Sequence, residues 1–470
     1  MNFEAVIGLE IHLEMKTKSK MFSSAPVSFG DKPNTNVAPL DMALPGALPV
    51  VNKQAVINSI RLCNALHMQI DDELWFDRKN YFYSDLAKGY QITQHRRPIG
   101  KEGYLDINTK KVRIERLHME EDTCKQVHTK NYTYLDYNRS GIPLVEIVTY
   151  PDIHNGEEAM RFVEKIRLIA SFLGVSDGKM EEGSLRCDVN ISIRPIGSQL
   201  MGKKVEIKNI NTLNNIQRAI DFEIKRQQAL LLSGETIKQD TRRYDESIRQ
   251  TISMREKTDS IDYKYFTDPN LPPIKLSKDF IDEAIKTSPE LPEVIIRRFE
   301  SLGLSNYDSR LLTVDKDTVY YFDSMVNCGA NYKLAANWLL VDIRTVLKIQ
   351  NITINQFIVS PDNMARLISL IEKGVISNTQ AREVFIKMQN DNKDATLIVD
   401  ELGIALINDE EELLKVINVV LNNNQQAIND YKKGKNRVIG LLVSQVIKLT
   451  SGKANPKLTS DLIIKELKER

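Results

Sequence analysis

The hydrophobic pattern of this chain changes once, near residue 290, and that change limits the folds it can adopt. Before that point, short apolar runs alternate with polar residues at the spacing of two that is typical of β-strands. After it, apolar residues recur at the spacing that forms one face of an α-helix. Pro289 and Pro292 mark the break, because the residue before each proline is disfavoured in helical geometry.

The part before the break combines strands with a few helices. We expect strands at 6–15, 111–120, 143–149, 185–194 and 205–210. We expect helices at 52–67, 156–172 and 214–232. Because apolar helix faces need a surface to cover, these helices are expected to back the sheet.

The fold class is therefore predicted as α+β. Residues 1–292 are expected to form a cradle domain, a mixed or antiparallel sheet with helices. Residues 293–400 are expected to form an all-α helical domain, and residues 401–470 a C-terminal helical tail domain.

Composition narrows the class of protein. The 470 residues are 42% hydrophobic and 27% charged, and the formal net charge is +1, which is ordinary for a globular protein and gives no overall attraction to nucleic acid. No secretory leader and no run of about 18 apolar residues is visible, so we expect no membrane association and a cytoplasmic or organelle-matrix location. The four cysteines form no C-x-x-C pair and are predicted to be free thiols.

The first expected strand has a polar face that could hold a cation. Alternation places Glu10, His12 and Glu14 on one face and apolar residues on the other. Glu146 interrupts an apolar run, where a buried carboxylate needs a metal or a counter-ion. A half-solvated sheet and an edge strand would produce the same two patterns.

Three consecutive acidic residues, Glu120, Glu121 and Asp122, end another expected strand. A period of two lets either Glu121 alone or Glu120 with Asp122 face inward. The pattern by itself leaves that choice open.

The strand at 185–194 presents Arg186, Asp188 and Asn190 on its polar face. A guanidinium can bind phosphate through two hydrogen bonds, so Arg186 is a candidate nucleotide or substrate contact, with Asp188 and Asn190 in support. A solvated outer face is an equally good interpretation. The chain has no P-loop, so any use of ATP requires another kind of site.

A segment at 76–83 places Lys79 among aromatic residues, and Lys88 follows shortly. Basic residues beside aromatic rings suit phosphates and unpaired bases, although a basic rim packed on core aromatics would look the same.

Near the C-terminus, Lys433, Lys435 and Arg437 precede an apolar helix. Such a cluster can neutralise RNA phosphates, and a solvated surface is the ordinary alternative.

Several ordered segments resemble a known family. They are 6–14, 76–83, 117–122, 138–147, 180–190, 206–209, 235–246 and 452–456. In these blocks the chain resembles the B subunit of the tRNA-dependent amidotransferases, the GatB family. The blocks cover nearly the whole chain in the expected order, which makes the resemblance far more specific than a single motif.

That resemblance implies a ligase of protein biosynthesis that acts on misacylated Glu-tRNA(Gln), Asp-tRNA(Asn) or both. With Mg²⁺ and ATP it would phosphorylate the side-chain carboxylate, and ammonia would then convert the acyl phosphate to an amide. The implied partners are tRNA(Gln) or tRNA(Asn), a glutamine-hydrolysing amidase (the A subunit) that supplies ammonia through a channel, and a small C subunit in a heterotrimer. Which tRNA is used stays open.

The resemblance also implies roles for residues. It selects Glu10, His12, Glu121 and Glu146 as catalytic, with His12, Glu121 and Glu146 as ligands of Mg²⁺.

Two basic groups receive roles in the same way. The resemblance places Lys79 and Lys88 along the ammonia route, and it assigns RNA binding to the three C-terminal basic residues named above.

Two other classes of protein would share some of these features. A metal-dependent phosphoesterase or nuclease also collects carboxylates and a histidine, but it hydrolyses its substrate without ATP. A non-catalytic tRNA-binding adaptor would keep the basic helical half and tolerate neutral residues at Glu10 and Glu146.

Overall fold

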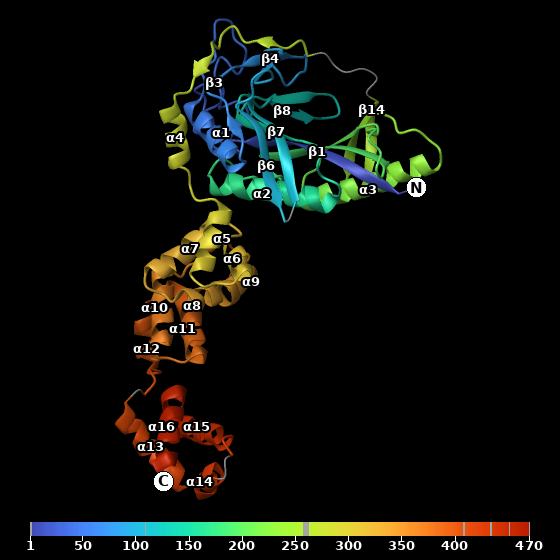
Figure 1. Ribbon diagram of the computed structural model, residues 1–470. Helices are drawn as coiled ribbons and strands as arrows, with labels where there is room; N and C mark the ends of the chain where they lie inside the picture. Colours follow the sequence, from blue (N-terminus) through green and yellow to red (C-terminus); the bar gives the residue numbers. More distant parts are fainter. Residues whose placement is uncertain are drawn as a thin grey trace. The chain divides into compact units, whose positions relative to one another are not determined.

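The computed structural model describes residues 2–108, 110–256, 263–407, 409–432, 435–450 and 452–469. The chain divides into two compact units, Met1–Pro292 and Glu293–Arg470 (Figure 1). The further boundary between residues 400 and 401 stays a prediction.

A nine-stranded sheet organises the first unit. Its strand order is β14-β13-β12-β11-β1-β10-β7-β6-β2, and all neighbours are antiparallel except the parallel pair β12 and β13. The strands are β1 (Phe3–Glu14), β2 (Gln69–Ile70), β6 (Gly100–Ile107), β7 (Lys110–Glu121), β10 (Pro143–Thr149), β11 (Leu185–Pro195), β12 (Val205–Lys208), β13 (Asp240–Asp245) and β14 (Gln250–Glu256).

Helices α1 (Lys53–Ala65), α2 (Gly156–Phe172) and α3 (Leu213–Leu232) cover one face of this sheet. Figure 1 shows α2 and α3 running beneath the strands. Leu9 and Ile11 of β1 are at most 1% exposed on the covered face, because alternate side chains of a strand point to opposite faces. The acidic and imidazole side chains of β1 therefore lie on the face that the helices leave free.

The starts of these helices follow capping rules. Asn52, Asn155 and Thr212 each accept a hydrogen bond from backbone N–H groups in the first turn of the helix that follows. These caps satisfy donors that a helix cannot pair internally.

Smaller elements line the free side of the unit. The described residues form three short sheets: β15 (Phe266–Thr267), β4 (Asp77–Asn80) and β5 (Tyr90–Thr93); β16 (Ile274–Lys275) with β3 (Glu73–Leu74); and β8 (Lys125–His128) with β9 (Thr133–Asp136). Helix α4 (Lys278–Lys286) packs on α1, where the Arg61 guanidinium donates to the carbonyl of Ala284 at 3.1 Å.

The regular elements of the second unit, among its described residues, are helices. Its α-helices are α5 (Pro292–Ser301), α6 (Asn306–Leu312), α7 (Lys316–Asn327), α8 (Tyr332–Asn337), α9 (Arg344–Gln350), α10 (Pro361–Glu372), α11 (Asn378–Asp391), α12 (Ala395–Leu402), α13 (Glu410–Asn422), α14 (Gln425–Lys432), α15 (Val438–Leu449) and α16 (Pro456–Glu469). A π-helical turn, Trp338–Ile343, joins α8 to α9, and a 3₁₀ turn, Ile354–Gln356, precedes α10.

Helices α13 to α16 enclose a small apolar core of their own. Leu413, Ile417, Leu442 and Ile463 are completely buried within it.

The predicted α+β class is confirmed, with a mixed sheet and helices followed by helices alone. The four cysteines are free, and three of them are buried. Among the described residues, no helix has both the length and the apolar character that crossing a bilayer requires.

Gly156, the first residue of α2, is predicted to be required for the contact between α2 and α3. A Cβ atom there would lie 2.6 Å from the carbonyl oxygen of Gln217, so Gly156→Ala should force the helices apart and lower the free energy of unfolding of the first unit by about 1–3 kcal/mol. Hydrogen-exchange mass spectrometry with denaturant would resolve the effect by segment.

Gly440, inside α15, is the matched control. Nothing lies within 4 Å of the position that a Cβ atom would take there, so Gly440→Ala should be neutral or stabilise α15 by up to about 1 kcal/mol. Equal destabilisation by both substitutions would contradict the packing argument.

Candidate functional site

A transverse row of polar side chains crosses the free face of the large sheet. In the antiparallel register, His118 of β7 pairs with Glu146 of β10, Glu146 pairs with His12 of β1, and His12 pairs with Arg186 of β11. Directly opposed residues project to the same face, so four strands bring these side chains together.

His12, Glu120 and Glu146 form the first compact group. One ligand atom from each lies within 4.8 Å of the others. The His12 Nε2 atom is 3.5 Å from Glu146 Oε2, and His118 Nε2 is 3.3 Å from both Glu146 Oε2 and Glu120 Oε1. The side chains of His118 and Glu120 are nearly buried, whereas His12 keeps 22% exposure and Glu146 keeps 13%, so the group opens toward the free side.

The charges of this group stabilise one another. Burial disfavours an imidazolium, but the carboxylates of Glu146 and Glu120 outweigh it and raise the pKa of His118 to about 9. The pKa of His12 is raised by Glu146 in the same way, against the effect of burial. In return, although burial opposes ionisation, the two histidines hold the pKa of Glu146 well below its ordinary value.

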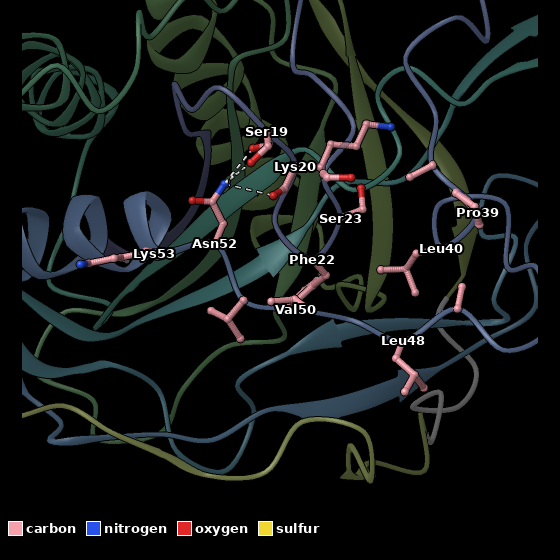
Figure 2. Close-up of a pocket in the computed structure, with 14 residues that line it drawn as sticks. Ser19, Lys20, Phe22, Ser23, Pro39, Leu40, Leu48, Val50, Asn52 and Lys53 are labelled. Carbon is pink, nitrogen blue, oxygen red and sulfur yellow. Dashed lines mark hydrogen bonds between the residues drawn. The ribbon is translucent and has the colours of Figure 1, made fainter.

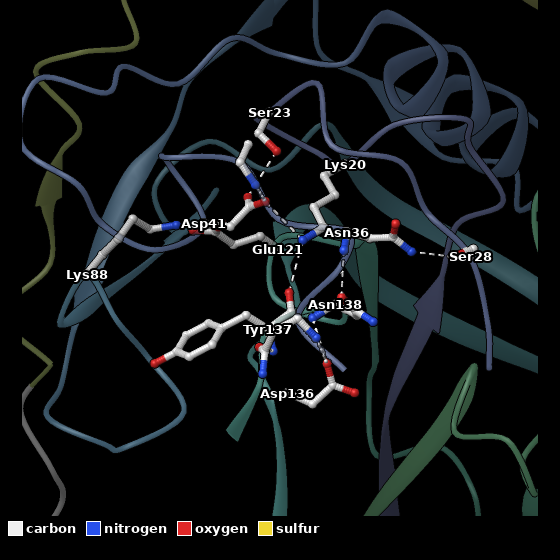
Figure 3. A network of polar contacts seen from close by, with 12 residues as sticks. Lys20, Ser23, Ser28, Asn36, Asp41, Lys88, Glu121, Asp136, Tyr137 and Asn138 are labelled. Atoms are coloured by element: carbon white, nitrogen blue, oxygen red, sulfur yellow. Dashed lines mark hydrogen bonds and ion pairs between the residues drawn. The ribbon is translucent and has the colours of Figure 1, made fainter. Parts of the chain in front are cut away.

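Glu121, chosen from the sequence as a metal ligand, faces the other way. Its carboxylate accepts hydrogen bonds from the Lys88 ammonium at 2.6 Å and from the backbone N–H of Ile92 at 3.1 Å, and Figure 3 shows the Lys88 and Glu121 side chains meeting. Because neighbouring residues of β7 point to opposite faces, Glu120 joins the group and Glu121 does not. This corrects the assignment of Glu121 to the metal group.

Glu10 belongs to a second acidic group, with Asp188 and Glu206, whose ligand atoms also lie within 4.8 Å of one another. The Lys208 ammonium lies 2.5 Å from Asp188 Oδ2 and 3.3 Å from Glu206 Oε1. Asn190 donates to Glu10 Oε1 at 2.8 Å. The structure therefore places Asp188 and Asn190 beside Glu10, as parts of one polar surface on β1, β11 and β12.

Arg186 is held by an acid that the sequence analysis did not select for the site. Its guanidinium donates to Asp122 Oδ2 at 2.6 Å, and the carboxyl groups of Asp122 and Glu14 share a hydrogen bond. Burial and the nearby Asp122 raise the pKa of Glu14 to about 8, while Arg186 and Arg139 lower that of Asp122 to about 2 against the effect of burial. A proton shared between two carboxyls explains this opposite pair of shifts.

Lys79 lies between aromatic rings and close to the group of His12, Glu120 and Glu146. Its ammonium is 5.0 Å from the ring centroid of Tyr263 and 5.8 Å from that of Tyr81. The pKa of Lys79 is raised despite burial, because the negative charges of Glu120 and Glu146 act on it. Lys79 and Tyr263, which are far apart in the sequence, thus lie together near the first group.

The predicted RNA-binding residues lie in the second unit. Lys435 and Arg437 are exposed between α14 and α15, and Lys435 pairs with Asp430 at 3.1 Å. Lys433 lies outside the described residues.

Several polar residues of the site were not predicted from the sequence. His118, Asp122, Glu206 and Lys208 each alternate with apolar residues along a strand or end one, which was the only available signal. The pairing of those strands was required to place them beside His12 and Glu10.

A cavity of about 650 Å³ lies apart from these groups (Figure 2). Its lining is mainly apolar and comes from residues 19–24, 38–40 and 47–53, and the described residues that line it include no acid. The Asn52 amide spans its wall by donating to the carbonyls of Ser19 and Lys20. A cavity of this kind offers no ligand set for a cation.

The donor set of His12, Glu120 and Glu146 fits a divalent cation. Two carboxylates offer the hard oxygen ligands that Mg²⁺ prefers, and three protein ligands leave positions for water and phosphate oxygens. The imidazole extends the fit to Mn²⁺.

The pKa of His118 should report cation binding. Without a divalent ion, its imidazolium contributes stability at neutral pH that is lost as the pH rises through about 9, because the folded-state pKa is raised. Saturating Mg²⁺ should neutralise Glu120 and Glu146 and shift the His118 pKa downward, as measured by NMR of ¹⁵N-labelled histidine.

His154, whose ring nitrogen contacts the carbonyl of Ala5, serves as the internal control for that titration. An unchanged His118 titration at saturating Mg²⁺ would show that the ion does not bind beside Glu120 and Glu146.

This chain is similar to proteins of one known family along nearly its whole length. Residues 5–282 match the family model described as the GatB/GatE catalytic domain, and residues 320–467 match the GatB domain. The chain is 47% identical over 470 residues to the B subunit of the aspartyl/glutamyl-tRNA(Asn/Gln) amidotransferase of Mesoplasma florum, with 99% of this chain and 98% of the relative covered. The B subunits of the same name from Bacillus velezensis and Staphylococcus aureus are each 46% identical, with complete coverage of both chains. The chain therefore belongs to the GatB family, the B subunits of the tRNA-dependent amidotransferases.

Proposed function

We propose that this protein performs the ATP-dependent amidation of Glu-tRNA(Gln), Asp-tRNA(Asn) or both. The observation that carries the proposal is the convergence of His12, Glu120 and Glu146 from three strands on the open face of the sheet. A surface of this kind suits a reaction that brings anionic ATP to an anionic carboxylate. The names of its relatives supply the substrate class.

The reaction has two steps, phosphorylation of the carboxylate and amidation of the acyl phosphate. First, an oxygen of the side-chain carboxylate attacks the γ-phosphorus of ATP, and ADP leaves. Ammonia then attacks the acyl carbon, phosphate leaves, and the nitrogen loses a proton. A bound Mg²⁺ would neutralise phosphate charge and hold the reacting groups in line.

The chain's own residues have separate parts in these steps. We assign metal binding to His12, Glu120 and Glu146, and we assign to His118 the task of keeping both carboxylates ionised and oriented. Arg186, which Asp122 holds in place, is assigned to a phosphate of the nucleotide or the acyl phosphate.

Glu10, Asp188 and Asn190 form the adjoining surface, where they support the nucleotide side of the site. The carboxylates of Glu10, Asp188 and Glu206 would hold a further cation if the Lys208 side chain moved away, because its ammonium contacts Asp188 and Glu206.

Ammonia is proposed to come from a glutamine-hydrolysing amidase partner, the A subunit, with a small C subunit as the third member of a heterotrimer in the cytoplasm or an organelle matrix. Lys79 and Lys88 are the proposed route. The buried pair between Lys88 and Glu121 lies on the face of β7 opposite to Glu120, so ammonia arriving there would have to pass β7 to reach the acyl phosphate. Lys435 and Arg437, with Lys433, are proposed to contact the tRNA.

The matched substitutions Glu120→Gln and Glu121→Gln test the assignment of the two neighbours. Glu120→Gln, like Glu146→Gln, should lower ATP-dependent phosphorylation of the aminoacyl-tRNA at least about 100-fold, because a ligand charge is lost where phosphate charge must be neutralised. Binding of tRNA should change by no more than about twofold. The measurement is mass spectrometry of the aminoacyl end after incubation with ATP and Mg²⁺.

Glu121→Gln should retain most of that phosphorylation. A loss as large as that of Glu120→Gln would return Glu121 to the phosphoryl-transfer site. Complete absence of ATP hydrolysis by the unsubstituted complex would instead favour a phosphoesterase or an adaptor.

Lys88 should matter for ammonia supply and not for phosphorylation. The double substitution Lys88→Met with Glu121→Gln removes both charges of the buried pair, which avoids leaving one of them uncompensated. Glutamine-dependent amidation should fall at least about tenfold, while amidation with ammonium salts should stay within about twofold of the unsubstituted complex. Equal losses with both nitrogen sources would exclude a role confined to ammonia delivery.

A further inference from the structure

The hairpin of β8 and β9 has an unusual place in the fold. It lies within the connection between β7, which carries Glu120, and β10, which carries Glu146. Those two strands are adjacent and antiparallel, so the hairpin leaves the sheet directly beside the first acidic group. Figure 1 shows it on the side of the sheet away from α2 and α3.

The outer part of this hairpin is exposed and aromatic. All residues from 127 to 134 are exposed, including Tyr132 at 68%, Tyr134 at 59% and Val127 at 45%. The two tyrosine rings lie 6.3 Å apart between centroids. Val127 pairs with Tyr134 across the hairpin, so an apolar face is formed that no other described element covers.

The same hairpin is basic. Lys125 and Lys130 are exposed, and the one acid of the hairpin, Asp136, lies opposite Lys125 at its base and accepts hydrogen bonds from the backbone N–H groups of Asn34 and Asn138. In the part of the chain that the structure describes, neither lysine has an ion-pair partner. Exposed aromatic rings combined with free ammonium groups suit single-stranded nucleic acid, where bases stack and phosphates pair with cations.

The base of the hairpin is held rigidly, although two-stranded hairpins are weakly stable alone. Asn34 donates to Asp136 Oδ1 and to the carbonyl of Leu135, and it accepts from the backbone N–H of Tyr137. The buried Lys20 ammonium donates to the Tyr137 carbonyl at 3.0 Å and to Asp41 at 2.9 Å. Figure 3 shows the Lys20, Asp41, Asp136 and Tyr137 side chains of this network.

We propose that the β8–β9 hairpin binds the unpaired nucleotides of the tRNA that lie next to its aminoacyl end. The rings of Tyr132 and Tyr134 stack on bases, and Lys125 and Lys130 contact phosphates. This inference rests on the proposed function, because an aminoacyl group placed at Glu120 and Glu146 brings the neighbouring nucleotides to the end of these strands.

The dimensions agree with that occupant. A strand of four residues spans about 13 Å. Stacked nucleotides are spaced by about 3.4 Å, so the hairpin has the length of about four of them. A polyanion also matches the charge of the hairpin.

The test compares complete tRNA with tRNA that lacks its unpaired 3′ nucleotides, using the full chain. Tyr132→Ala with Tyr134→Ala should weaken binding of complete tRNA at least about fivefold, because stacking contacts are lost. The truncated tRNA should bind the variant and the unsubstituted chain equally. Lys125→Ala with Lys130→Ala should reduce the slope of log affinity against log salt by about 1.4, the value for two phosphates of a single strand.

Exposed residues elsewhere provide matched controls. Tyr307→Ala with Tyr320→Ala removes two tyrosines that are 71% and 72% exposed in the second unit, and Lys278→Ala with Lys286→Ala removes two exposed lysines of α4. These controls should leave the discrimination between complete and truncated tRNA unchanged.

Two results would overturn the proposal. One is an equal loss of affinity for complete and truncated tRNA in the tyrosine variant. The other is unchanged tRNA binding together with failure to assemble with the amidase, which would make the hairpin a protein contact. Amidation by the unsubstituted complex with ammonium salts tests the proposed function separately, so a failure of one is distinguishable from a failure of the other.

Discussion

The antiparallel register of β7, β10, β1 and β11 is the constraint on which the site depends. It aligns His118, Glu146, His12 and Arg186 across four strands and places the Glu146 carboxylate between the two histidines, while Arg186 at the end of the row pairs with Asp122. A shift of one residue in any pair would turn the side chains of that strand to the helix-covered face. The apolar residues of the same strands prevent such a shift, because they would be expelled from the core at the same time.

Strand β7 carries two neighbouring carboxylates, Glu120 and Glu121, that point to opposite faces of the sheet. Glu120 lies with His12 and Glu146, where it suits phosphoryl chemistry, whereas Glu121 pairs with Lys88 on the opposite face. Alternation within one strand can thus keep two charged environments apart with a single sheet thickness between them. The loop network of Lys20, Asp41 and Tyr137 lies beside the second environment and supports the base of the hairpin (Figure 3).

The acids of the two groups have cationic partners without a bound ion. Lys208 contacts two acids of the second group, and His118 contacts two acids of the first. Buried carboxylates that lack a counter-ion would cost folding free energy, so these cations allow the sheet to form before any substrate arrives. The β8–β9 hairpin, which follows β7 in the chain, has the opposite character, since its tyrosine side chains are largely exposed.

Periodicity and ordered motifs are local properties of the chain, so the fold class, the change from strands to helices and the family could be predicted from the sequence, and His12 and Glu146 could be selected as candidates. The sequence could not decide between Glu120 and Glu121, since a period of two is compatible with either face. It also could not bring Lys208 to Asp188, or Tyr263 to Lys79, because those contacts depend on strand pairing and loop packing between distant segments. These contacts follow from the register that the apolar side chains of the sheet impose, which becomes visible once the strands are paired.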